Sequence, residues 1–507
     1  MKQEIFNIHN FDNYKEDNCR EVKSAKGGLP QSLWETYSAF ANSNGGVIIL
    51  GACERADGSW VTTGIKKEDT RKLIKNFWNI INDSKKVSLN LLSEKDVEIY
   101  DVNEDVVLVI KVPMAPRQDK PIYLNGDLLG QAYRRNHEGD YRCTKAQVKG
   151  MLRDQPEITM DMNILEDIPM DYLNYETVNG YRNRHKYLKL GHPFEKLTDN
   201  EFLRSIGAAA ISKEDEEYHP TGAGLLVFGD EYNILRHYPE YFLDYREMLD
   251  PTIRWTDRVQ SSSGEWSGNV CDFYFRVYNK IIKEVKVPFK MIGGTRIDDT
   301  PVHKALREAL ANCLVNADFY EPRGVVIKLE NHKLTIENPG YIRVGKKQIL
   351  LGGISDPRNK GLMKMFNMID IGERAGSGVS NIFNTWEDEG YEVPEIIEEF
   401  NPDRTKLVLS FEKKAEEKSG RKKSAKKIGE KKSAKKIGEL SISPKIMSKL
   451  EFLLGNMELG RWYKVSDLVD VLELKESRTR QLIGFLVDAG KIIEEGSTKG
   501  KRYQKKI

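Results

Sequence analysis

A single helix near residue 310 carries polar side chains where a packed helix normally carries none. Small and apolar residues recur at helical spacing from His303 to Asp318, so one helix face should pack against a sheet. Glu308, Asn312 and Asn316 follow at i, i+4 and i+8, which places a carboxylate and two carboxamides on one stripe. Polar groups beside a buried face need partners. The stripe therefore predicts a binding site, although a solvated helix face fits the same spacing.

The residues after this helix predict further parts of such a site. Residues 324–338 have the pattern of two strands joined by a polar turn, and a Pro339-Gly340 break follows them. Gly376-Ser377-Gly378 then opens a second helix. The free backbone N–H groups at such a glycine-rich helix start suit a phosphate.

This order of helix, hairpin and glycine turn resembles the GHKL ATPase superfamily. There the Asn, here Asn312, holds Mg²⁺ on the nucleotide phosphates, and the Glu four residues earlier, here Glu308, orients the attacking water. The resemblance implies ATP and Mg²⁺ as cofactors, and a weak ATPase reaction. The implied nucleotide-binding residues are Asn312, Asn316, Glu337, Asn338, Gly340, Gly376, Ser377 and Gly378.

The chain departs from the superfamily at one place. Glu337-Asn338-Pro339-Gly340 stands where other members have an Asp that reads adenine, followed by two glycines. Pro339 has no backbone N–H to donate there. The block from Arg358 to Gly378 resembles bacterial proteins known as RecG-related transcriptional regulators.

The N-terminal 155 residues predict an α/β domain. Glu21-Val22-Lys23 alternates like a strand, residues 33–41 form the apolar face of a helix, and Val47–Leu50 is a buried strand after an Asn-Gly-Gly break. The pattern Glu-x-Lys followed by Ala-Phe-Ala-Asn-x-x-Gly-Gly resembles the AlbA-like domain of the Schlafen family. This resemblance implies nucleic-acid binding, and the adjacent pair Arg134 and Arg135 is a candidate for phosphate contact or for plain surface charge.

Some Schlafen proteins cleave RNA with three acidic residues. Glu16 and Glu21 resemble two of these, and Glu54 or Asp57 would supply the third. Clustered carboxylates can hold a divalent cation that activates water. The alternative function is therefore a metal-dependent nuclease acting on RNA or single-stranded nucleic acid, used against phage; the domain could equally bind without cleaving.

The C-terminal region changes composition abruptly at about residue 414. A nine-residue segment, Lys422–Glu430, repeats directly as residues 431–439, and one Ile in each repeat cannot bury a core. Beyond it, three short amphipathic helices and a basic-tipped hairpin at 491–503 resemble a winged helix-turn-helix domain. The predicted DNA contacts are Ser477, Arg478, Thr479, Arg480, Gln481, Lys499, Lys501 and Arg502.

Together these patterns predict a multidomain α+β protein with an AlbA-like α/β domain, a GHKL-like α/β sandwich and a C-terminal winged helix-turn-helix. Residues 156–290 read as a connecting α/β region with a short strand at 242–246 and no chemical constellation. The predicted regions are 1–155 AlbA-like, 156–290 connecting, 291–413 GHKL-like, 414–440 basic linker and 441–507 winged helix.

The whole-chain composition adds little, because the net charge is only +2 over 507 residues. No apolar run is long enough to cross a bilayer, no signal peptide is evident, and the five cysteines are scattered, so we expect a cytoplasmic protein. The preferred interpretation is a DNA-binding transcriptional regulator that binds ATP, with RNA as a further partner and with self-association. The other interpretations are the nuclease, and a scaffold that uses the wing for protein contacts.

Overall fold

A computed structural model describes most of the first 413 residues and parts of the last 55. The described residues are 19–55, 60–102, 104–137, 139–285, 300–372 and 376–413, the backbone of 290–292 and 295–297, and separate stretches between 453 and 505. The chain divides into two compact units, residues 1–416 and 417–507. The basic linker and its tandem repeat lie outside the described residues.

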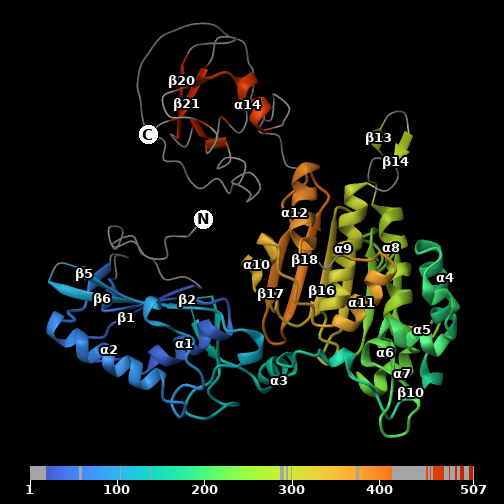
Figure 1. Cartoon of the computed structure of the whole chain (residues 1–507), viewed down its shortest axis with the longest axis horizontal. Coiled ribbons are helices and arrows are strands. Elements are labelled where there is room, and N and C mark those ends of the chain that lie inside the picture. Colours follow the sequence, from blue (N-terminus) through green and yellow to red (C-terminus); the bar gives the residue numbers. More distant parts are fainter. Residues whose placement is uncertain are drawn as a thin grey trace. The chain divides into compact units, whose positions relative to one another are not determined.

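A four-stranded sheet with the order β1-β2-β6-β5 forms the centre of the N-terminal part (Figure 1). Its strands are β1 (Arg20–Lys23), β2 (Gly46–Leu50), β6 (Asp105–Val112) and β5 (Val97–Val102). β1 runs parallel to β2, and the other neighbours are antiparallel. Helices α1 (Ser32–Asn42) and α2 (Lys67–Ile81) pack on one face through one apolar cluster. The strand, helix and strand predicted between residues 21 and 50 are confirmed.

The Asn-x-x-Gly-Gly motif has a physical reason in this domain. The buried Asn42 side chain donates to the carbonyls of Ile122 (2.8 Å) and Tyr133 (2.9 Å) and accepts from the Ile122 N–H (2.7 Å). Gly45 has a φ of +73°, and a Cβ there would lie 2.8 Å from the Val112 carbonyl oxygen. The motif therefore joins α1 to β6 and to the segment that leads into the hairpin of β7 (Tyr133–Asn136) and β8 (Gly139–Arg142).

The second sheet of the first unit has six strands in the order β12-β11-β15-β16-β18-β17. Only β11 and β15 are parallel. The strands are β11 (Leu243–Met248), β12 (Asp257–Gln260), β15 (Val325–Glu330), β16 (Lys333–Pro339), β17 (Glu395–Glu399) and β18 (Arg404–Ser410). The hairpin predicted at 324–338 and the strand predicted at 242–246 are confirmed. Because β11 and β12 precede residue 290, the sheet extends across the predicted boundary there.

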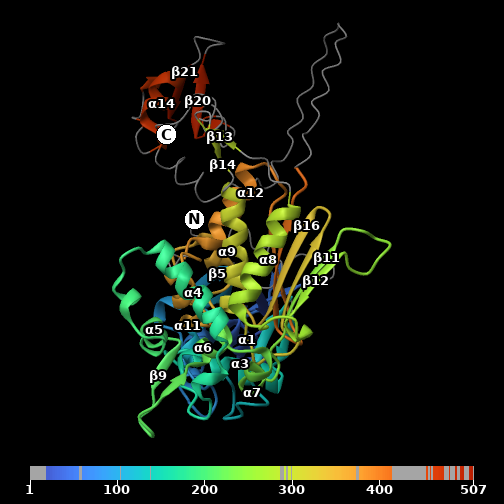
Figure 2. The same cartoon turned by 90° about the vertical axis from the view of Figure 1, so that its right-hand side faces the viewer.

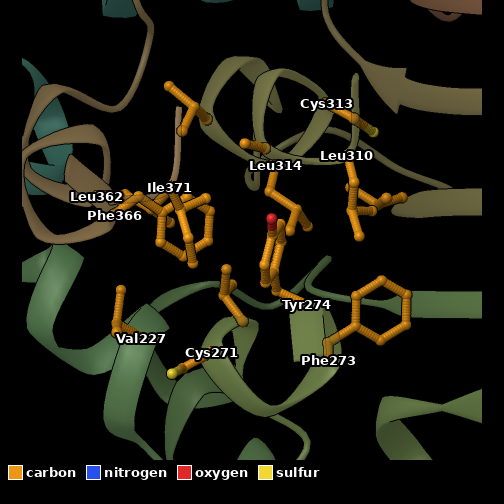
Figure 3. Packing of buried hydrophobic residues seen from close by; sticks show 14 of the residues in the cluster. Val227, Cys271, Phe273, Tyr274, Leu310, Cys313, Leu314, Leu362, Phe366 and Ile371 are labelled. Carbon is orange, nitrogen blue, oxygen red and sulfur yellow. The ribbon is translucent and has the colours of Figure 1, made fainter. Parts of the chain in front are cut away.

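Helices cover one face of this sheet, as Figure 2 shows for α8 and α9 beside β16, β11 and β12. They include α8 (Val270–Glu284), α9 (Pro301–Asn316), α11 (Lys360–Met368) and α12 (Gly378–Asp388). Their apolar side chains, with those of α6 (Gly222–Phe228), form the largest core of the chain. Leu310 and Leu314 of α9 lie in it with Tyr274 of α8 and Phe366 of α11 (Figure 3).

Smaller elements complete the first unit. α3 (Lys145–Asp154) follows the β7–β8 hairpin and begins at a capping box of Thr144 and Gln147. α10 (Lys346–Leu351) lies between β16 and α11. The others are β3 (Ala52–Glu54), β4 (Trp60–Thr62), α4 (Tyr175–Leu188), α5 (Asp199–Ile206), β9 (Ala209–Ile211), β10 (Tyr218–Pro220), α7 (Glu231–His237), β13 (Lys290–Ile292) and β14 (Thr295–Ile297).

The C-terminal unit contains an antiparallel three-stranded sheet with the order β19-β21-β20. Its described elements are β19 (Trp462–Tyr463), α14 (Val465–Leu472), β20 (Ile492–Glu495) and β21 (Arg502–Lys505). Leu453, Leu468, Ile483 and Tyr503 contribute to its apolar core. The predicted helix at 465–472 and the predicted C-terminal hairpin are therefore confirmed, while the winged-helix assignment stays a prediction. No helix in the described part of the chain is long and apolar enough to span a bilayer.

Candidate functional site

The polar stripe of α9 lies where the sequence places it, on the edge of the buried helix face. Thr300 and His303 form a capping box at the helix start, and Pro301 occupies its first turn. Glu308, Asn312 and Asn316 are each half-buried, between residues that the core covers completely. Their side chains therefore lie at the boundary between the packed core and the space outside it.

The three stripe residues are linked by hydrogen bonds. The Asn312 Nδ2 donates to Glu308 Oε1 at 3.1 Å, and the Asn316 Nδ2 donates to the Asn312 carbonyl oxygen at 2.9 Å. Asn338, at the end of β16, donates to the Pro339 carbonyl oxygen at 3.0 Å and approaches the Asn316 carbonyl oxygen at 3.5 Å. These bonds fix the side chains on one wall and point the amide groups toward the same space.

The start of α12 closes the site opposite α9, and the two helices pack side by side (Figure 1). Gly376 has a φ of +68°, and a Cβ there would lie 2.7–2.8 Å from backbone atoms of Ile354. A Cβ on Gly378 would lie 1.9 Å from Glu308 Oε1. A Cβ at residue 376 would therefore meet backbone, whereas a Cβ at residue 378 would displace the Glu308 side chain. Ser377 makes no side-chain cap at the start of α12, and the Glu308 carboxylate lies against Gly378 there.

Neighbouring residues on β16 point to opposite faces of the sheet. Asn338 lies on the helix-covered face and lines the site. Glu337 lies on the other face, where it pairs with Lys328 (3.0 Å), Arg404 (3.5 Å) and Lys406 (3.8 Å). Of the two, the structure therefore brings only Asn338 to the site. Gly340 is close by but faces Arg358, whose Nη1 would lie 2.4 Å from an added Cβ.

One cavity, hereafter the α9 pocket, unites these residues. It holds about 1070 Å³ of empty space, a figure that includes the open solvent at its mouth. Its apolar wall includes Ile336, Ile349, Ile354 and Leu407. Its polar lining includes Glu308, Asn312, Asn316, Asn338, Arg343, Ser355, Asp356 and Thr405, together with Gly376 and Gly378. Ser377, between the two glycines, is not part of the lining.

Sequence reasoning missed the charged cluster behind this pocket. Arg117, Asp154, Arg343, Asp356 and Arg358, hereafter the Arg/Asp cluster, are buried or half-buried. Arg358 binds Asp154 through Nε (3.1 Å) and Nη2 (3.0 Å) and donates from Nη1 to the Asn316 carbonyl oxygen (2.6 Å). Arg358 was noted only as part of a family-like block. No periodicity marks the other four, because they lie in loops or at a helix end.

Arg134 and Arg135 are not a phosphate-binding surface, which corrects the expectation of nucleic-acid contact. Arg135 is buried and pairs with Glu21 (2.9 Å) and Asp140 (2.9 Å). Arg134 is buried on the other side of the strand, pairs with Asp403 at 2.5 Å, and lies over the rings of Tyr341 and Phe400. Both guanidinium groups therefore hold the protein's own carboxylates. The Arg134 pair joins the AlbA-like domain to the end of the second sheet.

The predicted acidic triad of a nuclease is only partly within the described residues. Glu21 is already neutralised by Lys23 (2.8 Å) as well as by Arg135, while Glu54 is exposed. Glu16 and Asp57 lie outside the described residues. Among the residues that the structure does describe, no three His, Cys, Asp or Glu side chains are grouped to hold a metal ion.

The predicted DNA-contact residues of the C-terminal unit fall into three groups: buried, exposed and outside the described residues. Thr479 is fully buried in the unit, so it cannot contact DNA, and this corrects its assignment. Arg502 is exposed at the start of β21. Ser477, Arg478, Arg480, Gln481, Lys499 and Lys501 lie outside the described residues.

Three family models match successive parts of the chain. "Schlafen, AlbA_2" matches residues 13–144, "Domain of unknown function (DUF8451)" matches residues 149–244, and "Putative ATP-dependent DNA helicase recG C-terminal" matches residues 322–409. Residues 13–144 are therefore similar to the Schlafen AlbA_2 family and residues 322–409 to the RecG C-terminal family, as the motifs predicted. No curated protein matches the chain.

Two solved structures are similar to the chain. The DIP2311 protein of Corynebacterium diphtheriae is 17% identical over 96% of this chain and 92% of that chain, with a TM-score of 0.40. The N-terminal domain of a protein titled "Putative ATP-dependent DNA Helicase RecG-related Protein", from Nitrosomonas europaea, is 28% identical over 27% of this chain and 90% of that chain, with a TM-score of 0.21.

Proposed function

We propose that this protein is a nucleic-acid-binding regulator whose ATPase-like module binds ATP in the α9 pocket. The observation that carries the proposal is that one cavity gathers the α9 stripe, Asn338 and the glycine start of α12. These groups come from segments up to 70 residues apart (Glu308 to Gly378). Packing alone gives no reason to gather a helix start, amides and a carboxylate around empty space.

Each lining group fits one part of a nucleoside triphosphate. The N–H groups at the start of α12 suit phosphate oxygens, since a helix start carries a partial positive charge. The Asn312 carboxamide oxygen is a ligand type that Mg²⁺ accepts, and the Glu308 carboxylate is placed beside it to orient water. Asn338 offers a donor and an acceptor for a base edge, and Ile336 and Leu407 offer apolar surface for the ring. A bound Mg²⁺ would supply charge neutralisation for the phosphates.

The departure at Pro339 does not remove this fit. The Asn338 amide, on the pocket side of β16, provides the side-chain hydrogen-bonding groups expected at that position. Gly340 follows with a φ of +98°, which lets the chain turn sharply after the strand. Pro339 pairs with Arg404 of β18 and does not line the pocket, so the N–H that proline lacks is lost from the strand ladder and not from the pocket.

Calorimetric titration of the full chain with ATP at several Mg²⁺ concentrations tests the pocket. We expect Asn312→Ala to weaken ATP binding about tenfold or more, because a charge-assisted contact is lost from a partly buried site. Asn381→Ala is the matched control, because Asn381 is exposed on α12 and does not line the pocket. An Asn312→Ala protein that binds ATP as tightly as the wild type would contradict the proposal.

The nucleic-acid part of the proposal is supported by the Schlafen AlbA_2 and RecG C-terminal matches and by the basic character of the C-terminal region. Residues 418–436 carry many lysines, and Arg502 is exposed on the C-terminal hairpin. Since Arg134 and Arg135 are engaged internally, we assign DNA contact to residues 414–507. A basic segment gains affinity for DNA because its binding releases counterions from the phosphates, whether or not the segment is folded.

Binding of duplex DNA measured by fluorescence anisotropy over a salt series tests this assignment. We expect affinity to fall linearly with the logarithm of salt concentration, and Arg502→Ala to reduce that slope by about one. Lys67→Ala, an exposed lysine of α2, should leave the slope unchanged. Salt-insensitive binding would instead favour a scaffold that contacts proteins.

A further inference from the structure

Arg343 is a buried cation in the wall of the α9 pocket. It follows β16 and also lines two further cavities. Its side chain is only 3% exposed. The Nη1 donates to the Pro357 carbonyl oxygen at 3.1 Å, and the Nη2 lies 3.2 Å from Asp356 Oδ2. Arg343 and Asp356 therefore belong both to the pocket lining and to the Arg/Asp cluster.

The hydrogen bonds around Arg343 leave one of its buried nitrogen atoms without a partner among the described residues. Its Nε is buried and has no hydrogen-bond partner among the described residues, and it lies 3.9 Å from Asp154 Oδ1. Asp154 is held by Arg358 instead. Burial lowers the pKa of the Arg343 guanidinium, and Arg358 adds to this effect. An arginine can donate five hydrogen bonds, so Arg343 retains capacity for an anion.

Asp356 is the partner that Arg343 shares with the AlbA-like domain. The Arg117 Nε lies 3.0 Å from Asp356 Oδ2, the same oxygen that Arg343 approaches. Arg117 is fixed in place, because its Nη1 donates to the carbonyls of Gln155 (3.0 Å) and Pro156 (2.7 Å). Asp356 can therefore stay paired with Arg117 when Arg343 turns to another anion.

We propose that Arg343 binds the phosphate groups of a nucleotide in the α9 pocket, and that Asp356 competes with the nucleotide for it. Arg117 sets the strength of this competition from the AlbA-like domain, because it draws Asp356 away from Arg343. The inference rests on the proposed function of the pocket. It makes a residue of the AlbA-like domain a determinant of nucleotide affinity, although Arg117 does not line the α9 pocket.

Parallel calorimetric titrations with Mg-ATP and with adenosine test the role of Arg343. We expect Arg343→Met to weaken ATP binding about tenfold or more and to leave adenosine binding unchanged, because only ATP has charges to lose. Arg343→Lys, which keeps the charge without the planar fork, should recover part of the ATP affinity. Equal loss for both ligands, or no loss for ATP, would overturn the proposal.

A double-mutant cycle tests the competition. Asp356→Asn should tighten ATP binding in the wild-type background and should have no such effect in the Arg343→Met background. If the gain persists without Arg343, Asp356 acts by direct repulsion of phosphate and the proposal is wrong. If Arg343→Met does not fold, Arg343→Lys takes its place in the cycle, and the gain from Asp356→Asn should then be smaller than in the wild-type background.

Arg117→Met tests the contribution of the AlbA-like domain. It should weaken ATP binding several-fold, opposite in sign to Asp356→Asn, because Asp356 is then left to Arg343 alone. The loss should vanish in the Asp356→Asn background; an equal loss there would overturn the coupling. Melting temperatures separate this effect from unfolding. A wild-type chain that binds no ATP at all would refute the proposed function itself, whereas ATP binding indifferent to Arg343 and Arg117 would refute only this inference.

Discussion

Asp154→Asn is expected to lower the free energy of unfolding of the first unit by about 3–5 kcal/mol, the usual cost of removing one charge from a buried ion pair. Asp154 is 6% exposed and faces two buried guanidinium groups, those of Arg358 and Arg343. The substitution keeps the size of the side chain and removes its charge. Both arginines would then lack a compensating carboxylate at that position.

The same pair predicts a pH dependence. Burial acts to raise the pKa of Asp154, but Arg358 and Arg343 outweigh it and hold the pKa below its ordinary value. A carboxylate with a lowered pKa stabilises the folded state above its unfolded pKa of about 3.9, and this contribution is lost as the pH falls through the folded pKa. The stability difference between wild type and Asp154→Asn should therefore be constant near neutral pH and shrink below about pH 4.

Denaturant unfolding followed by circular dichroism measures both effects. Asp101→Asn is the matched control, since Asp101 belongs to an ion pair with Lys67 whose side chains are 64% and 59% exposed. Its effect should stay within about 1 kcal/mol. An Asp154→Asn protein that loses no more than this control would show that Arg358 and Arg343 do not depend on the carboxylate.

Gly376→Ala is expected to disrupt the α9 pocket and to weaken ATP binding at least about tenfold, through displacement of the α12 start that should bind phosphate. The φ of +68° costs any other residue about 1 kcal/mol or more. In addition, the new Cβ would meet the Ile354 N, C and O atoms at 2.7–2.8 Å. Backbone atoms cannot move aside as a flexible side chain can, so the 353–355 segment must separate from α12.

Gly353→Ala is the control for this change. Gly353 has a φ of +82°, and no atom of the described residues lies within 4 Å of an added Cβ, so Gly353→Ala has the conformational cost without the contact. Calorimetry and thermal melting of both variants separate the two causes. If Gly376→Ala behaves like Gly353→Ala in ATP affinity, the contact between Gly376 and Ile354 does not shape the pocket.

Sequence patterns predicted the parts of this fold that have a local signature, such as a regular spacing of residue types. The α9 stripe, the β15–β16 hairpin and the glycine start of α12 each have a local signature, and the structure places all three around one pocket. The α1 and β2 elements were equally visible. Their signals depend on one segment at a time, which is the information that a single sequence contains.

Contacts between residues that are far apart in the sequence could not be predicted from it. Arg134 and Arg135 are an adjacent basic pair on a strand, and nothing local reveals that Asp403, 269 residues away, and Glu21 neutralise them. Glu337 and Asn338 are adjacent as well, and only the register of β16 against β18 decides which one faces the pocket. Arg343, Asp356 and Arg117 are isolated charges in loops, so their meeting depends on the docking of two domains.

The location of Asp154 means that cutting the first unit in two would affect the stability of its two halves differently. Asp154 closes α3, the helix that follows the β7–β8 hairpin, yet it neutralises arginines that belong to the ATPase-like module. A fragment ending at residue 144 would merely expose Arg134 and Lys120 to water, which hydrates them well. A fragment starting after residue 155 would retain Arg358 and Arg343 in its interior with their counter-charge cut away. Any excised or transplanted ATPase-like module should therefore keep α3 at its amino end.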